Sequence, residues 1–225
     1  MEKIEQIPLI LDFEEIKSKL HIKRTRDKAE VQNLFERAKP LIHARAVYKN
    51  CYIDEKLADG VIIEGMHFKS GVLLKNLHKV GRIFPHVVTI GMGIEKMIHE
   101  CDDLLEQYYL DVIGNVALIK AQKYIEDHLR FQFGLGQISF MSPGSLEDWP
   151  LEQQNPLFSL LGDVEGSIGV RLNKSLLMIP RKSISGIYFP SEVTFYSCQL
   201  CPRERCEGRK APYTEGLARE YGILK

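Results

Sequence analysis

Apolar residues recur at helical spacing in several stretches of the chain. A short helix is predicted at residues 12–20, where an aspartate stands at the capping position. A longer helix is predicted at residues 27–46, with a break or kink at Pro40 because proline cannot donate the helical hydrogen bond. The strongest periodicity covers residues 108–131, and its single apolar stripe indicates a long helix that packs on a sheet.

Runs of β-branched and aromatic residues alternate with turn residues elsewhere in the chain. Residues 47–53 and 61–68 flank a turn signal at 58–60 and are predicted to pair as a hairpin. Further strands are predicted at residues 84–90, 138–141 and 168–172. Short helices are predicted at residues 72–80, with Ser70 as the cap, and at 155–161, and a loop is predicted at residues 162–166. Helices and strands do not alternate regularly, so the pattern favours an α+β fold with a mixed, largely antiparallel sheet over a doubly wound one.

The charge balance excludes some classes of partner. The 225 residues include 30 basic and 30 acidic ones, which gives a net charge of zero and no electrostatic footprint for nucleic acid or an anionic membrane. No stretch approaches the roughly 20 apolar residues that span a bilayer, and the first residues do not have the pattern of a targeting segment. We therefore expect a soluble, cytoplasmic protein that binds neither nucleic acid nor membrane.

Length and cysteine usage indicate how the chain is organised. An apolar fraction of 44% is enough for one mixed domain with a sizeable core. We predict an N-terminal arm at residues 1–25, an α+β domain at residues 26–197 and a cysteine-containing tail at residues 198–225. An odd count of five cysteines fits a reducing compartment better than a secreted disulfide framework.

Two dense runs of turn-forming, polar and aromatic residues stand at residues 142–150 and 178–189. The first fixes a turn beside acidic residues and Trp149, the only tryptophan, and this mixture suits a cationic ligand. In the second run, Pro180 and Gly186 bracket two serines, and two aromatic residues follow at once. The alternative interpretation is that both runs only form turns and bind no ligand.

The second run carries a specific pattern of residue types. It reads Met178-x-Pro180-x-x-Ser183-Ile184-Ser185-Gly186-x-Tyr188-Phe189. It is preceded, in order, by Ser142-Pro143-Gly144, Leu157-Phe158-x-Leu160-Leu161 and Ile168-Gly169-Val170-x-Leu172-x-x-Ser175. Together these motifs resemble the activation (reactivation) domain of cobalamin-dependent methionine synthase. The resemblance covers residues 142–190, about a fifth of the chain.

That resemblance implies an activation-domain-like fold with a bent sheet and a site for S-adenosylmethionine. In the family this ligand remethylates cobalamin after the cofactor has been oxidised and then reduced by one electron. Gly144 falls in the family's ligand loop, and Tyr188 and Phe189 fall at its second ligand-contacting segment. This chain has Phe140 where the family loop has arginine and Ser145 where it has tyrosine, and the gap after Gly144 is one residue longer. Another group would therefore hold the carboxylate of the ligand.

S-adenosylmethionine carries a sulfonium, an ammonium and a carboxylate, so its pocket needs aromatic faces or carboxylates near the sulfur and hydrogen-bond donors near the acid end. Glu147 and Asp148 could balance the positive charges of the ligand, and Trp149 could supply the missing aromatic ring. The alternative is that Glu147 and Asp148 only solvate a surface turn. The predicted cofactor-binding residues are Gly144, Ser145, Glu147, Trp149, Ser185, Gly186, Tyr188 and Phe189.

The source of the cobalamin follows from a missing motif. The sequence has no Asp-x-His-x-x-Gly run, which provides the lower cobalt ligand in cobalamin domains of the family. The resemblance therefore implies that a partner, cobalamin-dependent methionine synthase or another corrinoid protein, presents the cobalamin, and that an electron donor protein reduces it. We expect a free-standing auxiliary protein of methionine biosynthesis with no catalytic residue of its own, because methyl transfer to cobalt depends mainly on alignment. A docking module that binds no small molecule is an alternative.

A cluster of cysteines follows the region of resemblance. The spacing of Cys198, Cys201 and Cys206 lets two thiolates meet one metal while the third folds back, so zinc or an iron–sulfur cluster could bind if a fourth ligand came from elsewhere. A redox-active dithiol and inert thiols are equally open. The alternative function is accordingly a metal or iron–sulfur redox protein that works through these three residues.

Overall fold

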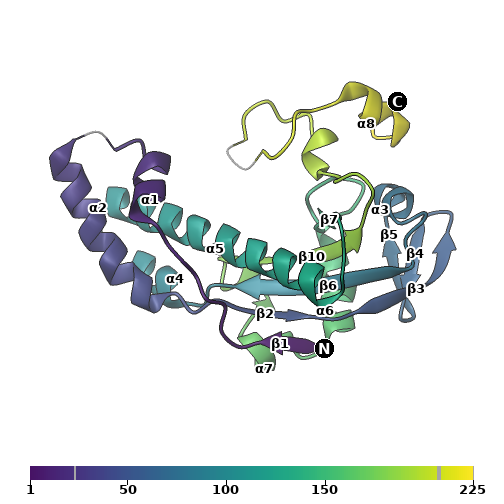
Figure 1. Ribbon diagram of the computed structural model, residues 1–225, viewed down its shortest axis with the longest axis horizontal. Coiled ribbons are helices and arrows are strands. Elements are labelled where there is room, and N and C mark those ends of the chain that lie inside the picture. Colours follow the sequence, from purple (N-terminus) through teal and green to yellow (C-terminus); the bar gives the residue numbers. More distant parts are fainter. Residues whose placement is uncertain (23, 207–208, 225) are drawn as a thin grey trace.

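The main feature of the computed structural model, which describes residues 1–22, 24–206 and 209–224, is an eight-stranded sheet (Figure 1). Its strands pair antiparallel throughout. They are β1 (Glu2–Ile4), β2 (Arg45–Tyr48), β3 (Cys51–Leu57), β4 (Gly60–Ile63), β5 (Met66–Lys69), β6 (Arg82–Thr89), β7 (Ile138–Met141) and β10 (Ser183–Pro190). Two short strands, β8 (Arg171–Leu172) and β9 (Met178–Ile179), pair separately.

Strand β6 lies at the centre of the sheet because both of its edges are paired. One edge pairs with β2 and, further along, with β3, and the other pairs with β10, which pairs in turn with β7. Phe84 and Val88 of β6 pack into one apolar cluster, whereas Ile83 and Val87 point to the opposite face and pack into two others. Because both faces are covered, β6 is buried from Ile83 to Thr89, His86 included, instead of alternating between buried and exposed residues.

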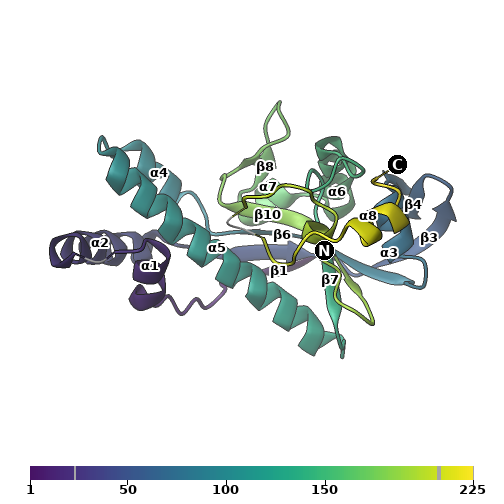
Figure 2. The same cartoon turned by 90° about the horizontal axis from the view of Figure 1, so that it is seen from above.

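Helices cover both faces of this sheet. They are α1 (Phe13–Lys19), α2 (Thr25–Ala38), α3 (Gly71–Asn76), α4 (Gly93–His99), α5 (Leu104–Gln132), α6 (Gln154–Leu161), α7 (Val164–Ile168) and α8 (Glu215–Glu220), with 3-10 turns at Lys39–Leu41, Leu151–Gln153 and Ser197–Gln199. The long helix α5 crosses one face obliquely, with α2 and α4 beside its first half (Figure 2). Helices α6 and α7 pack on the other face. None of the helices in the described residues combines the length and apolar character needed to cross a bilayer.

The α+β class with a largely antiparallel sheet is confirmed. Strand β7 has the predicted bounds, and the predicted long helix is α5, which begins four residues earlier. Two predicted caps are present, since Asp12 accepts a hydrogen bond from the Glu14 amide and Ser70 accepts one from the Leu73 amide.

Several predicted elements are wrong. The predicted strands at 47–53 and 61–68 each cover parts of two strands, β2 and β3 in the first case and β4 and β5 in the second. The helix predicted to run to Ala46 ends at Ala38, where a 3-10 turn around Pro40 redirects the chain into β2. The loop predicted at 162–166 is largely the helix α7, because the Asp163 side chain accepts a 2.7 Å hydrogen bond from the Gly166 amide and caps that helix. The strand predicted at 168–172 is accordingly reduced to β8.

Both ends of the chain contribute to the same fold. Strand β1 pairs with β2, and Ile7 and Ile16 belong to the core cluster under α5. At the other end, Leu200 and Ala218 are fully buried in the cluster that contains α3 and Trp149. The C-terminal segment therefore packs against the sheet near β7 (Figure 1).

Candidate functional site

A cavity of about 440 Å³ lies between the second half of α5, strand β7 and the segment after β10. Its volume falls within the range of about 300–1,000 Å³ that is usual for small-molecule sites. The lining residues are Gln122, Glu126, Arg130, Gln137, Ile138, Phe140, Ser142, Ser145, Tyr188, Thr194, Phe195, Tyr196, Ser197, Cys198 and Lys210. The cavity thus joins segments that are up to 88 residues apart in the chain.

Aromatic rings form the floor of the cavity. Phe140 and Tyr188 lie on the paired strands β7 and β10, with ring centroids 5.1 Å apart. Behind them, the His86 ring of β6 stacks on Tyr188 at 4.6 Å. Gly186 makes room for this arrangement, because a Cβ at that position would lie 2.4 Å from the Phe140 ring and 2.4 Å from the Met141 carbonyl oxygen. The strands therefore hold an apolar surface of two tilted rings at a fixed position.

The Tyr188 hydroxyl is buried and stays protonated. The side chain is 2% exposed, and its hydroxyl donates a 3.5 Å hydrogen bond to the Gln122 carbonyl oxygen. Burial is the main cause that raises the pKa of Tyr188 far above its ordinary value, with smaller contributions from nearby carboxylates. Tyr188 consequently stays protonated at any physiological pH and offers a ring edge and no base.

The turn after β7 supplies hydroxyl groups. Ser142 donates a 2.8 Å hydrogen bond to the Ser185 carbonyl oxygen, and Ser145 donates a 2.6 Å bond back to the Ser142 carbonyl oxygen. Gly144 has a φ of +80°, which favours glycine, and its amide donates a 2.7 Å bond to the Trp149 carbonyl oxygen. The predicted turn is thus closed on itself, and it presents Ser142 and Ser145 to the cavity.

Charged side chains stand at the rim. Glu126 and Arg130 are one turn apart on α5, with Arg130 Nη1 4.0 Å from Glu126 Oε1, and Lys210 borders the cavity from the C-terminal segment. Their side chains are 32% and 42% exposed, so this pair contributes little to stability and its members can turn to a ligand. The rim therefore offers one carboxylate and two cationic groups.

One arginine fixes the wall that the C-terminal segment provides. The Arg209 guanidinium donates to the carbonyl oxygens of Cys198 at 3.0 Å, Cys201 at 3.2 Å, Ala211 at 3.2 Å and Arg203. Since the planar guanidinium has a rigid set of donors, it holds these backbone segments at a defined separation. The position of the adjacent Lys210 depends on this clamp.

The structure brings some of the predicted ligand residues to the cavity and leaves others away from it. Ser145 and Tyr188 line it, while Gly144 and Gly186 shape the turn and floor without lining it. The positions that lie elsewhere are Glu147, Trp149, Ser185 and Phe189.

Each of those four side chains has another environment. Trp149 has no exposed surface and packs in the core beside α3, and Phe189, 1% exposed, belongs to the same cluster. Ser185 is 1% exposed, and its hydroxyl donates a 3.4 Å bond to Gln154 Oε1. Glu147 is exposed on the outside of the turn. The side chain of Trp149 therefore does not take the place of the missing family tyrosine.

Asp148 has a structural partner. Its carboxylate accepts hydrogen bonds from the Gly71 amide at 3.2 Å, the Val72 amide at 2.9 Å and the Ser70 hydroxyl. These donors belong to the first turn of α3, where a carboxylate also complements the helix dipole. Asp148 consequently fixes the turn after β7 onto α3.

The three cysteines of the C-terminal segment are free thiols. Cys198 and Cys201 are half-buried and Cys206 is exposed. Within residues 1–22, 24–206 and 209–224, no three histidine, cysteine, aspartate or glutamate side chains are grouped so that they could hold a metal ion. Cys198 contacts the cavity instead, and its Sγ accepts a 3.5 Å hydrogen bond from the Lys210 amide.

The polar residues of α5 were not among the predicted site residues. Gln122, Glu126 and Arg130 recur at four-residue spacing beside the apolar stripe, so they share one helix face. That spacing is a detectable signal, but it is also typical of a solvated helix edge. Tyr196 and Lys210 gave no signal, because only the path of the C-terminal segment brings them to the cavity.

Taken together, the cavity combines an aromatic floor, serine and threonine hydroxyls, one carboxylate and two cationic side chains. Such a set suits a ligand that has a flat ring, hydroxyl groups and an amino-acid part with both charges.

Comparisons with known proteins support the fold. No protein-family model matches the chain, and no curated protein matches it significantly. Among solved structures, the crystal structure of the MetH reactivation domain bound to AdoHcy is similar, with a TM-score of 0.54 and 16% sequence identity. The similarity covers 84% of this chain and 72% of that chain. At this identity the likeness shows a shared fold, and it confirms the predicted activation-domain-like architecture.

Proposed function

We propose that this protein binds S-adenosylmethionine in the cavity between α5, β7 and residues 194–198, and supports reductive methylation of cobalamin on a partner protein. One observation carries the proposal: the fold is that of a reactivation domain whose structure contains AdoHcy, and the two segments that resemble that family meet at one cavity through Ser142, Ser145 and Tyr188. AdoHcy is the product that S-adenosylmethionine leaves after methyl transfer.

The charges at the rim replace the arginine that the family loop has at position 140. Arg130 and Lys210 can bind the carboxylate of the ligand, and Glu126 can bind its ammonium or lie near its sulfonium. The rings of Phe140 and Tyr188 offer a surface for the adenine or the sulfonium. The carboxylate of the ligand and one of its two positive groups thus have partners of opposite charge in the cavity, and the aromatic rings can face the other positive group.

The partner we propose is cobalamin-dependent methionine synthase or another corrinoid protein. Cobalamin, presented by that partner and reduced by an electron donor protein, would supply the strongly nucleophilic cobalt that accepts the methyl group. The residues of this chain have to hold the methyl donor at a fixed angle and exclude water, because alignment is the main requirement of the transfer. The rigid strands β7 and β10 suit that task.

Isothermal titration calorimetry with S-adenosylmethionine and with AdoHcy tests the binding. We expect both ligands to bind. Arg130→Gln and Lys210→Gln should each weaken binding by about tenfold, because each removes a charge-assisted hydrogen bond, which contributes about 1.5–3 kcal/mol. Lys174→Gln is the matched control, because Lys174 is exposed and does not border this cavity. Absence of heat with both ligands at millimolar concentration would exclude the site and leave a docking module.

The reactivation itself needs a second assay. Inactive cob(II)alamin-bound methionine synthase is mixed with this protein, S-adenosylmethionine and a chemical reductant, and the methylcobalamin absorbance is followed. We expect it to rise only when all components are present, and to rise more slowly with Arg130→Gln. An equal rate without this protein would contradict the proposed role while leaving ligand binding intact.

A further inference from the structure

The cavity of about 440 Å³ contains a buried amide that the fold does not use. Among the described residues, nine side chains of serine, threonine, histidine, glutamine or glutamate are buried. Seven of them take part in side-chain hydrogen bonds, and the exceptions are His86 and Gln122. Both ring nitrogens of His86 are enclosed by the core, whereas Gln122 lines the cavity. Gln122 therefore combines burial, a missing partner and access to a space of ligand size.

Gln122 lies next to the aromatic floor of this cavity. Its backbone carbonyl oxygen accepts the 3.5 Å hydrogen bond from the Tyr188 hydroxyl, so the residue lies at the hydroxyl end of that ring. The bond uses the backbone alone, and the side-chain amide forms no hydrogen bond with any residue in the described ranges. Gln122 is 7% exposed and lines the cavity, so the donor and the acceptor of its amide are available to a bound molecule.

An amide in this position favours a ligand with matching polar groups. A buried amide without hydrogen bonds is unfavourable, because it has lost water and gained no partner. A ligand that presents one acceptor and one donor side by side satisfies both halves of the amide. A ligand without that pair leaves them unsatisfied, and a site of this kind discriminates strongly between the two.

The residues of α5 give the cavity a direction. Gln122, Glu126 and Arg130 follow one another at four-residue spacing, which places Arg130 about 12 Å along the helix from Gln122. Gln122 is buried, whereas Glu126 and Arg130 are half-buried. The end at Gln122 is therefore closed and uncharged on this helix, and the end at Arg130 is open and charged. An uncharged ring fits the closed end, and a charged amino-acid part fits the open end.

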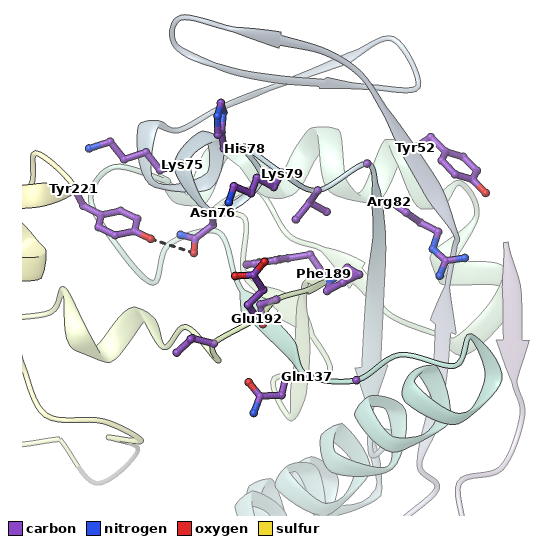
Figure 3. Close-up of a pocket in the computed structure, with 16 residues that line it drawn as sticks. Tyr52, Lys75, Asn76, His78, Lys79, Arg82, Gln137, Phe189, Glu192 and Tyr221 are labelled. Atoms are coloured by element: carbon purple, nitrogen blue, oxygen red, sulfur yellow. Dashed lines mark hydrogen bonds between the residues drawn. The ribbon is translucent and has the colours of Figure 1, made fainter.

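The larger cavity of the protein offers no comparable group. It has a volume of about 850 Å³, and it is bordered by the end of α3, the start of β6 and residues 189–193 (Figure 3). None of the polar side chains that line it in the described part of the chain is buried. Figure 3 shows Lys79 and Arg82 pointing to opposite sides of its lining. Recognition of a ligand by hydrogen bonds is therefore better supported at Gln122.

We propose that Gln122 recognises the base of the ligand, with its side-chain amide donating to N7 of adenine and accepting from the N6 amino group. The inference rests on the proposed function for the identity of the ligand, and it adds a specificity-determining residue. A glutamine amide matches the N6/N7 edge of adenine with two hydrogen bonds. Hypoxanthine has an oxygen in place of the amino group and presents two acceptors at that edge, so it can form only one of them.

Calorimetry on the full chain with AdoHcy, adenosine and inosine tests the assignment. Adenosine and inosine have the same ribose and differ in the base, so their comparison isolates recognition of the base. We expect adenosine to bind at least tenfold more tightly than inosine, because inosine leaves half of the buried amide unsatisfied. This ratio is measured on the wild-type protein and does not depend on the folding of a variant.

Gln122→Leu removes the amide and keeps a side chain of similar size. It should weaken the binding of AdoHcy and adenosine about tenfold and bring the affinities for adenosine and inosine close together. Its free energy of unfolding, measured with urea, should equal or exceed that of the wild-type protein, because no hydrogen bond of the described structure is lost. Gln132→Leu is the matched control and should keep the wild-type affinities, since Gln132 is exposed at the end of α5 and does not line the cavity.

The outcomes distinguish this inference from the proposed function. The assignment of Gln122 is overturned, and the proposed function stands, if AdoHcy binds equally well to Gln122→Leu or if adenosine and inosine bind alike. A marked loss of stability in Gln122→Leu also overturns it, because the amide then has a partner within the protein. If adenosine binds through Gln122 while neither S-adenosylmethionine nor AdoHcy binds, the proposed function fails and the base site remains. No binding of any of these molecules at millimolar concentration overturns both.

Discussion

The ring of Phe140 lies directly over Gly186 of the neighbouring strand. A Cβ built on Gly186 would be 2.4 Å from Phe140 Cε2 and 2.4 Å from the Met141 carbonyl oxygen. This contact lets Phe140, Tyr188 and His86 pack as one aromatic group beneath the smaller cavity. The phenylalanine that stands in place of the family arginine is therefore part of the floor, and the glycine of the second motif is what admits it.

Gly186→Ala should destabilise the protein because neither the backbone oxygen nor the ring can move away without loss of pairing. We expect the free energy of unfolding to fall by about 1–3 kcal/mol, the usual cost of overpacking a core. Urea unfolding followed by circular dichroism measures the change. Gly216→Ala is the control, since a Cβ there meets no atom within 4 Å, and equal stabilities of the two variants would show that the floor is loosely packed.

Substitutions at the neighbouring residues Asp148 and Glu147 should differ in their effect on the free energy of unfolding. Asp148→Asn loses charge-assisted hydrogen bonds to the first turn of α3 and should lower the free energy of unfolding by about 1–2 kcal/mol. Glu147→Gln, at an exposed position without a hydrogen-bond partner among the described residues, should change it by less than about 0.5 kcal/mol. Chemical denaturation of both variants checks this. A large loss of S-adenosylmethionine affinity in Glu147→Gln alone would restore the role first predicted for it.

Local patterns explain which parts of the fold were predictable. The stripe on α5 and the cap at Ser70 are determined by neighbours a few residues away, and both appear in the structure where the sequence places them. The helix predicted to reach Ala46 fails because the apolar spacing continues by coincidence after Pro40, while the residues pair with β6. Pairing with a strand some 40 residues later cannot be recognised from the local sequence.

The same reasoning applies to the candidate site. Tyr188 could be named because it sits in a motif that resembles a known family, and Ser145 because it directly follows another such motif. Trp149 was named on its residue type, but its burial depends on α3 and the C-terminal segment, which the turn sequence does not reveal. Lys210 reaches the cavity only because Arg209 clamps four carbonyl groups of its own segment. Contacts of this kind require three-dimensional coordinates.

The buried thiol of Cys51 should make the protein less stable in alkali. Burial, reinforced by the Glu64 carboxylate, raises the pKa of Cys51 to about 12, whereas the unfolded chain loses this proton near pH 8.5–9. The folded state then binds more protons than the unfolded state, so stability falls as pH rises from about 9 toward 12, by up to about 1.4 kcal/mol per pH unit.

Cys51→Ala should remove that part of the pH dependence. Urea unfolding at pH 8, 9 and 10 is expected to show a shallower decline for this variant than for the wild-type protein. The exposed Cys206 provides the control, since Cys206→Ala should keep the wild-type slope. Parallel slopes for all three proteins would mean that the Cys51 thiol ionises in the folded state.

The buried ring of His86 should make the protein less stable in acid. The ring has no exposed surface, and neither nitrogen has a well-formed hydrogen-bond partner in the described part of the chain. Burial lowers the pKa of His86 to about 3, against smaller opposing contributions from the backbone at Phe84 and Gly186. The unfolded chain binds this proton near pH 6.5, so stability is complete above that pH and is lost as pH falls toward 3.

His86→Phe keeps an aromatic ring against Tyr188 and removes both unpaired nitrogens. At pH 7 we expect stability to be equal to or above that of the wild-type protein, because an unsatisfied buried group costs about 1–3 kcal/mol. Below pH 6.5 the advantage of the variant should grow by up to about 1.4 kcal/mol per pH unit, measured by urea unfolding at pH 7, 6, 5 and 4. The exposed His99 serves as the control through His99→Gln. If His86→Phe and the wild-type protein lose stability in parallel, His86 is hydrated or protonated in the folded state, and the aromatic floor of the cavity is open to water.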